Sequence, residues 1–597
     1  MKKNTIIFLS LCLLFFSILP GQQETSAEKS DPLKDFSLVK ETQPAPEKVK
    51  TGLESITAED AVAYLKFLTS DLLEGRDTAS PGFYIAAHYT ASMFELWGIK
   101  PAGDIERPQM SRYFMRRDSS PRPTGKRTYF QNIPMIEILG NEGSAYAEYQ
   151  KGRMKQTKSF NQDTDYTYYA SESRSLSAPV VFVGYGIQEP SLKLDEYKGL
   201  DVKDKFIMML SETPGKDDPE SPFNKGELKE KYYPQRRRMR RSSSPKTELA
   251  MEQGALAILL VENSPENNGD VPQRTINRSA INDERPIIPG HFRRISLYER
   301  GNISRSWERI PTITISRAMA DDLLGFNGLD ITSLKNNIEK DLKSQSRVLE
   351  GVTLNIKNKA ETKLVNSMNV LGIIEGSDPE LKKEAIVIGG HLDHLGRRGD
   401  YIYNGADDNG SGSVGVMEIA EAFAKNPIKP KRSIIFALWT GEEKGLLGSR
   451  YYVTHPFIEK TAVNLNLDMI SRTYEKERMA MMARRWGIQM SKEVLDKIDA
   501  DRYVSLSYDA HTPQIEQIIR KNNDYVGLHI HISASKEASG GSDHAPFATQ
   551  NIPWAFFIAA MTEDYHQPSD TVEKINAKLM ERIIRMTYLT AFELADR

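Results

Sequence analysis

The last third of the chain alternates continuous apolar runs with segments of helical periodicity. Four of the runs are rich in Ile, Val, Phe and Ala, as is typical of strands buried on both faces of a sheet: EAIVIGG, RSIIFALW, AVNLNL and IPWAFFIAAM. Amphipathic segments such as SGSVGVMEIAEAFA separate them, and a final helix is expected from Ala577 to Ala595. The alternation predicts an α/β domain over residues 350–597, in which helices flank a mostly parallel sheet.

Two further parts precede this domain. From Thr57 to Leu96 apolar residues recur every three or four positions, which predicts helices, and the segment TYFQNIPMIEI indicates a strand. We assign residues 53–165 to the N-terminal part of the same domain. Residues 170–330 hold four short apolar runs, among them APVVFVGYGI and ALAILLVE, and two helix-like segments. They predict an inserted, β-rich domain between residues 53–165 and 350–597.

Residues 1–27 have the features of a secretory signal peptide. Two lysines precede an apolar run from Ile6 to Leu19, which is shorter than the roughly 18–20 residues that a membrane-spanning helix needs. Residues 28–52 are polar and rich in proline, which is typical of a flexible leader. Lipidation at Cys12 or an uncleaved anchor is the alternative. We therefore expect an exported protein, periplasmic or extracellular, with no stable membrane span.

Composition narrows the possible partners. Hydrophobic residues make up 39% of the chain and charged residues 27%, the proportions of a folded globular protein. The 79 basic and 81 acidic residues leave a formal net charge of -2, which gives no support to a nucleic-acid partner. Because Cys12 is the sole cysteine, an intrachain disulfide and a cysteine-type zinc site are excluded. A basic run, Arg236–Arg241, is interpreted as a solvated loop rather than a binding site for an acidic partner.

Chemistry-bearing side chains follow the predicted strands at the points where the strands end. In chain order they are His391 and Asp393, Glu442 and Glu443, Asp468, and, a little further from their strand, Tyr565 and His566. A fifth group, Asp407 and Asp408, lies in a glycine-rich turn before a helix. Because the carboxyl ends of parallel strands meet at one edge of a sheet, we expect these groups to lie close together.

Each group alone has an ordinary structural explanation. Asp407-Asp408 could cap a helix, and Glu442-Glu443 could favour the positive end of a helix dipole. A carboxylate such as Asp468, directly after an apolar strand, is costly to bury without a partner. Together, imidazoles and carboxylates suit zinc before manganese or cobalt. Five ligands exceed the needs of one tetrahedral zinc and fit two ions that share a carboxylate, an arrangement used in metal-assisted hydrolysis.

In this order and spacing, the motifs HLDH, GADDNGSG, WTGEEKGLLGS, LNLDM and DYHQPSDT are similar to those of the M28 family of zinc aminopeptidases. The segments LKFLTSDLLEGRDTASPG and LWGIKPAGD resemble the N-terminal helices of its secreted bacterial members. Residues 170–330 resemble a protease-associated (PA) domain. The resemblance implies a zinc-exopeptidase fold, two zinc ions per chain and peptide substrates.

The resemblance also implies a role for each motif residue. One metal would be held by His391 and Asp468, the other by Glu443 and His566, and Asp408 would bridge the two. Glu442 would be the general base that takes a proton from a metal-bound water. Asp393 would orient the ligating histidine, and Tyr565 would donate to the developing oxyanion.

Several residues and functions remain as alternatives. Asp543 and His544, in GGSDHAPF, are interpreted as pocket or supporting residues rather than ligands, and the remaining histidines of the catalytic part as structural: His394, His455, His529 and His531. A carboxypeptidase or dipeptidase could use the same ligands. A glutaminyl cyclase on the same fold and a non-catalytic PA-domain binding protein are the other candidates, and the full ligand set with Glu442 favours hydrolysis over both.

Overall fold

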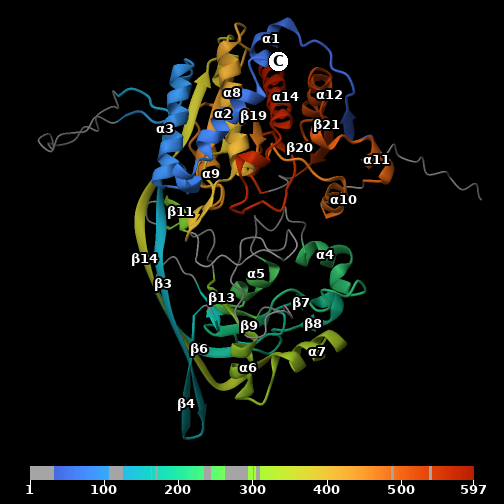
Figure 1. Ribbon diagram of the computed structural model, residues 1–597. Coiled ribbons are helices and arrows are strands. Elements are labelled where there is room, and N and C mark those ends of the chain that lie inside the picture. The colour runs from blue at the N-terminus through green and yellow to red at the C-terminus, as the bar shows by residue number, and fades with distance from the viewer. Residues whose placement is uncertain are drawn as a thin grey trace, which may run out of the picture.

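The computed structural model describes residues 33–106, 125–162, 164–168, 173–233, 244–261, 293–299, 302–303, 310–485, 490–536 and 541–597. Figure 1 shows two bodies joined by two long paired strands, β3 (Phe130–Lys151) and β14 (Arg347–Ile374). The predicted signal peptide and the basic run Arg236–Arg241 lie outside the described residues.

The upper body in Figure 1 is built on a sheet with the order β14–β18–β15–β19–β22–β20–β21–β1. Its strands are β1 (Phe36–Leu38), β15 (Glu384–His391), β18 (Ser433–Trp439), β19 (Lys460–Leu467), β20 (Tyr503–Asp509), β21 (His529–Ser535) and β22 (Trp554–Ile558). The four central strands, β18, β15, β19 and β22, are parallel. The predicted α/β class with a mostly parallel sheet is therefore confirmed.

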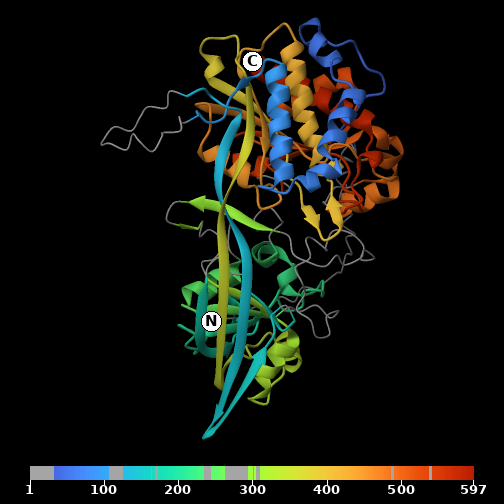
Figure 2. The ribbon, with the colours of Figure 1, turned by 60° about the vertical axis from the view of Figure 1, so that its left-hand side comes forward.

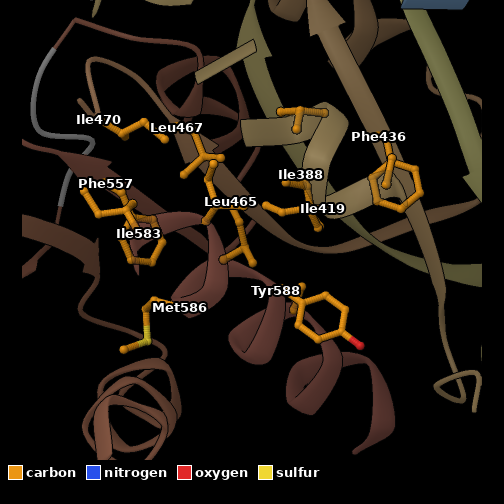
Figure 3. Close-up of a cluster of buried hydrophobic side chains, with 14 of the residues drawn as sticks. Ile388, Ile419, Phe436, Leu465, Leu467, Ile470, Phe557, Ile583, Met586 and Tyr588 are labelled. Atoms are coloured by element: carbon orange, nitrogen blue, oxygen red, sulfur yellow. The ribbon is translucent and has the colours of Figure 1, made fainter. Parts of the chain in front are cut away.

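Helices cover both faces of this sheet. On one face, residues of α8 (Gly412–Lys425) and α14 (Ala577–Asp596) pack on strand side chains, as Figure 3 shows for Ile419 and Ile583 beside Leu465. The same core includes residues from α1 (Glu47–Glu54), α2 (Ala58–Leu68), α3 (Pro81–Leu96) and α12 (Gln514–Val526). On the opposite face, α9 (Leu447–Thr454) and α13 (His544–Thr549) pack on Trp439. This two-sided burial explains why the strand sequences are apolar throughout.

The helices begin where the sequence supplies caps. The Thr57 hydroxyl accepts a hydrogen bond from the Asp60 N–H at the start of α2, and the Ser80 hydroxyl accepts one from the Phe83 N–H at the start of α3. The Asn576 side chain caps α14 in the same way. Such caps satisfy amides that have no partner within the helix, and each typically contributes about 1 kcal/mol.

The segment expected to be a flexible leader, residues 28–52, is partly ordered. Phe36–Leu38 pairs antiparallel with β21 at the edge of the sheet, and α1 begins at Glu47. The expectation was wrong for these residues because their few apolar side chains find partners. Phe36 is buried beside Met479 of α10 (Lys476–Arg485), close to α11 (Lys492–Lys497), and Val49 is buried in the main core.

The lower body has a sheet and a hydrophobic core of its own. Its strands follow the order β14–β6–β9–β10–β13–β5, with bounds β5 (Tyr166–Thr167), β6 (Arg174–Phe182), β9 (Phe206–Leu210), β10 (Ala257–Val261) and β13 (Thr312–Ile315). Its helices are α4 (Gly226–Tyr232), α5 (Pro245–Glu252), α6 (Arg317–Gly325) and α7 (Ile331–Asp341). Its core contains residues from Ala145 to Ile356. It therefore also includes residues of β3 and β14, which lie outside the predicted insertion at 170–330.

The two long strands form an antiparallel ribbon that belongs to both bodies. Near its upper end, β14 pairs with β18 of the upper sheet, and near its lower end with β6 of the lower sheet. The hairpin partner β4 (Met154–Phe160) and the short strand β11 (Arg294–Glu299) pair with β3. Figure 2 shows β11 beside the ribbon at the level between the two bodies. Within the described part of the chain, no helix is long and apolar enough to cross a membrane.

Candidate metal centre and active site

The strand ends place the predicted residues at one edge of the sheet. β15 ends at His391, β18 ends just before the turn that carries Glu442 and Glu443, and β19 ends just before Asp468. Asp408 lies in the turn before α8, and its peptide bond to Asn409 is cis. Because these strands are parallel, their carboxyl ends deliver the side chains to a common point.

His391, Asp408 and Asp468 form a first group of buried ligand atoms. His391 Nε2 is 3.3 Å from Asp408 Oδ1 and 3.6 Å from Asp468 Oδ1. His391 Nδ1 donates to the main-chain carbonyl oxygen of Asp393 at 2.9 Å. That hydrogen bond fixes the tautomer and turns Nε2 toward the two carboxylates. The orienting group is thus the Asp393 carbonyl and not, as the sequence suggested, its carboxylate.

The second oxygen of Asp408 faces a second group. His566 Nε2 is 3.1 Å from Asp408 Oδ2 and 3.2 Å from Glu443 Oε2. One carboxylate therefore contacts a histidine on each side, through a different oxygen atom each time. This is the geometry that a bridging ligand between two cations requires.

His394 also lies in this second group. It is fully buried, and its Nδ1 is 2.8 Å from Glu443 Oε1. Together with Asp408 and Glu443 it forms another set of ligand atoms close enough to hold an ion. Sequence reasoning favoured a structural role for His394, and the structure places it beside the predicted ligand His566, with ring centroids 5.9 Å apart.

The donor set fits divalent cations. Among the described residues, Asp408 Oδ2, Asp468 Oδ1 and Glu443 Oε1 are buried oxygens without a well-aligned hydrogen-bond donor. Burial alone lowers the pKa of His566, but Glu443 and Asp408 override it and raise that pKa to about 10. The buried carboxylates are thus stabilised by positive charge, and a divalent cation ligated by imidazole and carboxylate would supply it.

Glu442 is held next to the ligands through its backbone. Its N–H donates to Asp393 Oδ1 at 3.1 Å. Burial raises the pKa of the Glu442 carboxyl well above its ordinary range, and although His391 opposes this, Glu443 adds to it. A carboxyl that binds a proton more tightly than usual is suited to proton transfer near neutral pH.

Tyr565 stacks on the ring of His566, with centroids 3.8 Å apart and the planes at 23°. Burial, and after it the charges of Asp408 and Glu443, raise the pKa of its phenol well above the ordinary value. The phenol therefore stays protonated and can donate a hydrogen bond, which is the property that a donor to an oxyanion needs.

Three supporting residues escaped the sequence reasoning. Asp570 accepts hydrogen bonds from the backbone N–H groups of Asp407 and Asp408, at 3.0–3.1 Å, and so holds the bridging turn. Thr78 donates through its hydroxyl to Asp393 Oδ2 at 2.8 Å. The guanidinium of Arg76 donates to the carbonyl oxygens of Leu392, Asn404 and Gly405, beside the two loops that carry His391 and Asp408. The second carboxylate of the DYHQPSDT motif was a signal that could have identified Asp570, whereas Arg76 and Thr78 lie some 300 residues from Leu392 and Asp393, which they contact.

The remaining candidates are placed as follows. Asp407 Oδ1 accepts hydrogen bonds from the N–H and the hydroxyl of Ser471, so this oxygen is engaged beside the turn. Asp543 is buried and accepts a hydrogen bond from Ser449. His544 is buried against Trp554 and Phe556, with centroids 4.7 and 4.5 Å away.

Comparison with known proteins extends this description. Residues 369–591 match the sequence profile of peptidase family M28. Leupeptin-inactivating enzyme 1 of Streptomyces exfoliatus is 32% identical over 188 residues, or 31% of this chain and 34% of that protein. Aminopeptidase YwaD of Bacillus subtilis is 27% identical over 202 residues, or 32% of this chain and 38% of that protein. The alignments thus span little more than a third of these relatives.

The fold as a whole also has a solved counterpart. The aminopeptidase from Aneurinibacillus sp. strain AM-1 superposes with a TM-score of 0.51 and 18% identity, covering 92% of this chain and 96% of that one. This likeness concerns the fold alone. The family assignment comes from the matched residues, which contain every ligand-bearing motif described above. Residues 369–591 are therefore similar to peptidase family M28 over the whole stretch that carries the candidate metal ligands.

Proposed function

We propose that this protein is an exported zinc exopeptidase, an aminopeptidase that removes N-terminal residues from peptides with two zinc ions per chain. One observation carries the proposal: Asp408 offers one oxygen to each of two histidine–carboxylate groups, directly beside Glu442. The match to peptidase family M28 and the similarity to two enzymes that inactivate or cleave peptides support the reaction class.

The ligands of one ion would be His391, Asp408 and Asp468, and those of the other Asp408, Glu443 and His566. Bound zinc would supply Lewis acidity and lower the pKa of a coordinated water. Glu442 would take the proton from the attacking water and then deliver it to the leaving amine. The Tyr565 phenol would donate to the oxygen of the scissile carbonyl as it gains negative charge.

Two further parts of the proposal concern the remaining chain. We propose residues 1–27 as a signal peptide for export and residues 170–330 as a PA-like insertion that modulates access of peptides. A separate core in the lower body supports an insertion that folds as a unit. Among the described residues, both candidate metal groups come from the segment between His391 and His566, outside the insertion.

Metal analysis of the purified chain tests the metal centre. We expect two zinc ions per chain, and His391→Ala and His566→Ala should each deplete a different one. A stoichiometry of one that is insensitive to His566→Ala would refute the two-ion site. Peptides blocked at the amino or the carboxyl end test the polarity: an aminopeptidase cleaves only those with a free amino end. Cleavage that instead needs a free carboxyl end would identify a carboxypeptidase, and ring closure of N-terminal glutamine a cyclase.

A further inference from the structure

The segment Glu74–Ser80, which runs from the end of η1 (Asp71–Arg76) to the start of α3, has a constrained backbone. Glu74, Arg76 and Ala79 have φ values of 45°, 50° and 56°, a region that side chains other than glycine rarely adopt. Such conformations persist only where surrounding contacts determine them, and they concentrate at functional sites. The contacts of Asp77 and Thr78, in the middle of this segment, show what it serves.

On one side, Asp77 and Thr78 hold the turn that carries Glu442. Thr78 Oγ1 donates to Asp393 Oδ2 at 2.8 Å, and Asp393 Oδ1 accepts from the Glu442 N–H at 3.1 Å. Asp77 Oδ1 is 2.9 Å from Nζ of Lys444, whose side chain is only 6% exposed. The segment therefore contacts Lys444 directly and reaches Glu442 through Asp393.

On the other side, the same two residues are held by Arg293. Its Nη1 donates to the Thr78 carbonyl oxygen at 2.9 Å and to Asp77 Oδ2 at 3.2 Å. Its Nε donates to Glu137 Oε1 of β3 at 2.6 Å. The next residue, Arg294, begins β11 and pairs with Ile138 of β3. Figure 1 shows β11 where the ribbon leaves the upper body.

We infer that Arg293, which belongs to the inserted stretch between β10 and β13, is a positioning residue for the Glu442 turn. It acts through Asp77 and Thr78, and its hydrogen bonds go to these two residues and Glu137 and not to a proposed metal ligand. The planar guanidinium donates in fixed directions to three acceptors on two elements, which an ammonium group cannot reproduce. Through Arg293 the inserted stretch thus supports the proposed catalytic glutamate, and none of its described residues belongs to the candidate metal groups. This inference rests on the proposed function for its kinetic consequence.

The test compares Arg293→Ala, Arg293→Lys and Asp77→Asn in the full chain. Arg397→Ala is the matched control, because Arg397 forms an ion pair with Glu74 of the same segment, but both side chains are about half exposed. Two properties are measured: hydrogen–deuterium exchange at the Glu442 turn, which needs no activity, and kcat and KM on a peptide substrate with zinc bound.

For Arg293→Ala we expect kcat to fall about tenfold to a hundredfold, the range for groups that orient catalytic residues, with KM nearly constant and zinc content unchanged. Exchange at the Glu442 turn should be about tenfold faster. Arg293→Lys should restore kcat and slow exchange only in part. Arg293→Ala combined with Asp77→Asn should lower kcat no further than the more damaging single variant. The control should stay within about twofold of the natural protein.

Normal kcat in Arg293→Ala, or an equal loss in the control, would overturn the inference. So would additive effects of Arg293→Ala and Asp77→Asn. If Arg293→Ala does not fold, Arg293→Lys gives the same readouts. A natural chain without peptidase activity would refute the proposed function instead, and exchange at the Glu442 turn would still decide whether Arg293 holds it.

Discussion

Arg76 offers the sharpest test of how the loops that carry the proposed metal ligands are supported. The residue is 1% exposed, and its guanidinium donates to the backbone carbonyl oxygens of four residues, namely Leu68, Leu392 at 2.9 Å, Asn404 at 2.8 Å and Gly405 at 3.1 Å. Leu392 follows the proposed ligand His391, and Gly405 precedes the turn of Asp408. Arg76→Met keeps much of the volume and removes all of these donors.

The size of the effect follows from two opposing contributions. Each buried carbonyl left without a donor costs about 1–3 kcal/mol. Against this, the arginine itself is costly to bury: desolvation lowers the pKa of Arg76 to about 10, although Asp393 and two other carboxylates oppose the shift, and a change of that size corresponds to about 3 kcal/mol. With four carbonyls, the two contributions leave a net loss of about 1–9 kcal/mol. We expect Arg76→Met to destabilise the upper body by about 3–5 kcal/mol, the middle of that range and the usual loss when one partner of a buried ion pair is removed.

The loss is measured by urea unfolding, with hydrogen exchange in peptides from β15 and β18 as the signal. These peptides report on the upper body alone. Arg397→Met is the control, because it removes an exposed arginine near the same segment and should change stability by less than about 1 kcal/mol. Zinc affinity should fall together with stability, since both loops lose an anchor. A loss below about 1 kcal/mol for Arg76→Met, with normal zinc affinity, would show that the loops are held by other contacts.

Three further predictions concern single carboxylates and one histidine. Glu442→Gln should keep both zinc ions and lower kcat by about 10²–10⁴, whereas Glu443→Gln should weaken one zinc, and the opposite pattern in metal analysis would exchange the two roles. Burial raises the pKa of Glu418 on α8 from 4.5 to about 8, so between these pH values the folded chain keeps a proton that the unfolded chain loses, and stability falls as pH rises through that window. Glu418→Gln should flatten this slope in urea midpoints measured from pH 5 to 8, and an unchanged slope would refute the assignment. His394→Ala should keep two zinc ions but bind one about 10–100 times more weakly, if His394 orients Glu443; a stoichiometry of one would make it a ligand.

The strand-end argument located most of the candidate site because it depends on local sequence and one topological rule. Buried parallel strands are apolar throughout, so EAIVIGG and AVNLNL are recognisable, and the residues that follow them must share an edge. β20 and β21 were not recognised in the same way. β20 alternates buried and partly exposed positions, and the weaker pattern VSLSY does not stand out from its surroundings.

The supporting residues could not be found by that argument. Arg76 and Thr78 lie in a turn whose φ values and contacts depend on the folded position of loops some 300 residues away. His394 lies three residues after His391, past the end of β15, where strand periodicity no longer says which way a side chain points. The order of residues 36–38 likewise depends on partners, because Phe36 is buried only when β21 and α10 are in place.

The pairing of β3 and β14 determines which parts of the molecule can move relative to the Arg293 contact. β3 and β14 are paired from Phe130 with Val370 to Tyr149 with Val352, with one shift in register at Glu361. Two paired strands resist bending far more than two single-stranded linkers, since their backbone hydrogen bonds would have to break. The shift in register between Glu361 and Thr362 is a β-bulge, and a bulge is the point where such a ribbon twists most readily. It lies on the side of the Arg293 anchor that faces the lower body, because β11 pairs with β3 residues 135–138, opposite β14 residues from Thr362 onward. Twisting at the bulge can therefore move the lower body while Arg293, Asp77 and the Glu442 turn keep their positions.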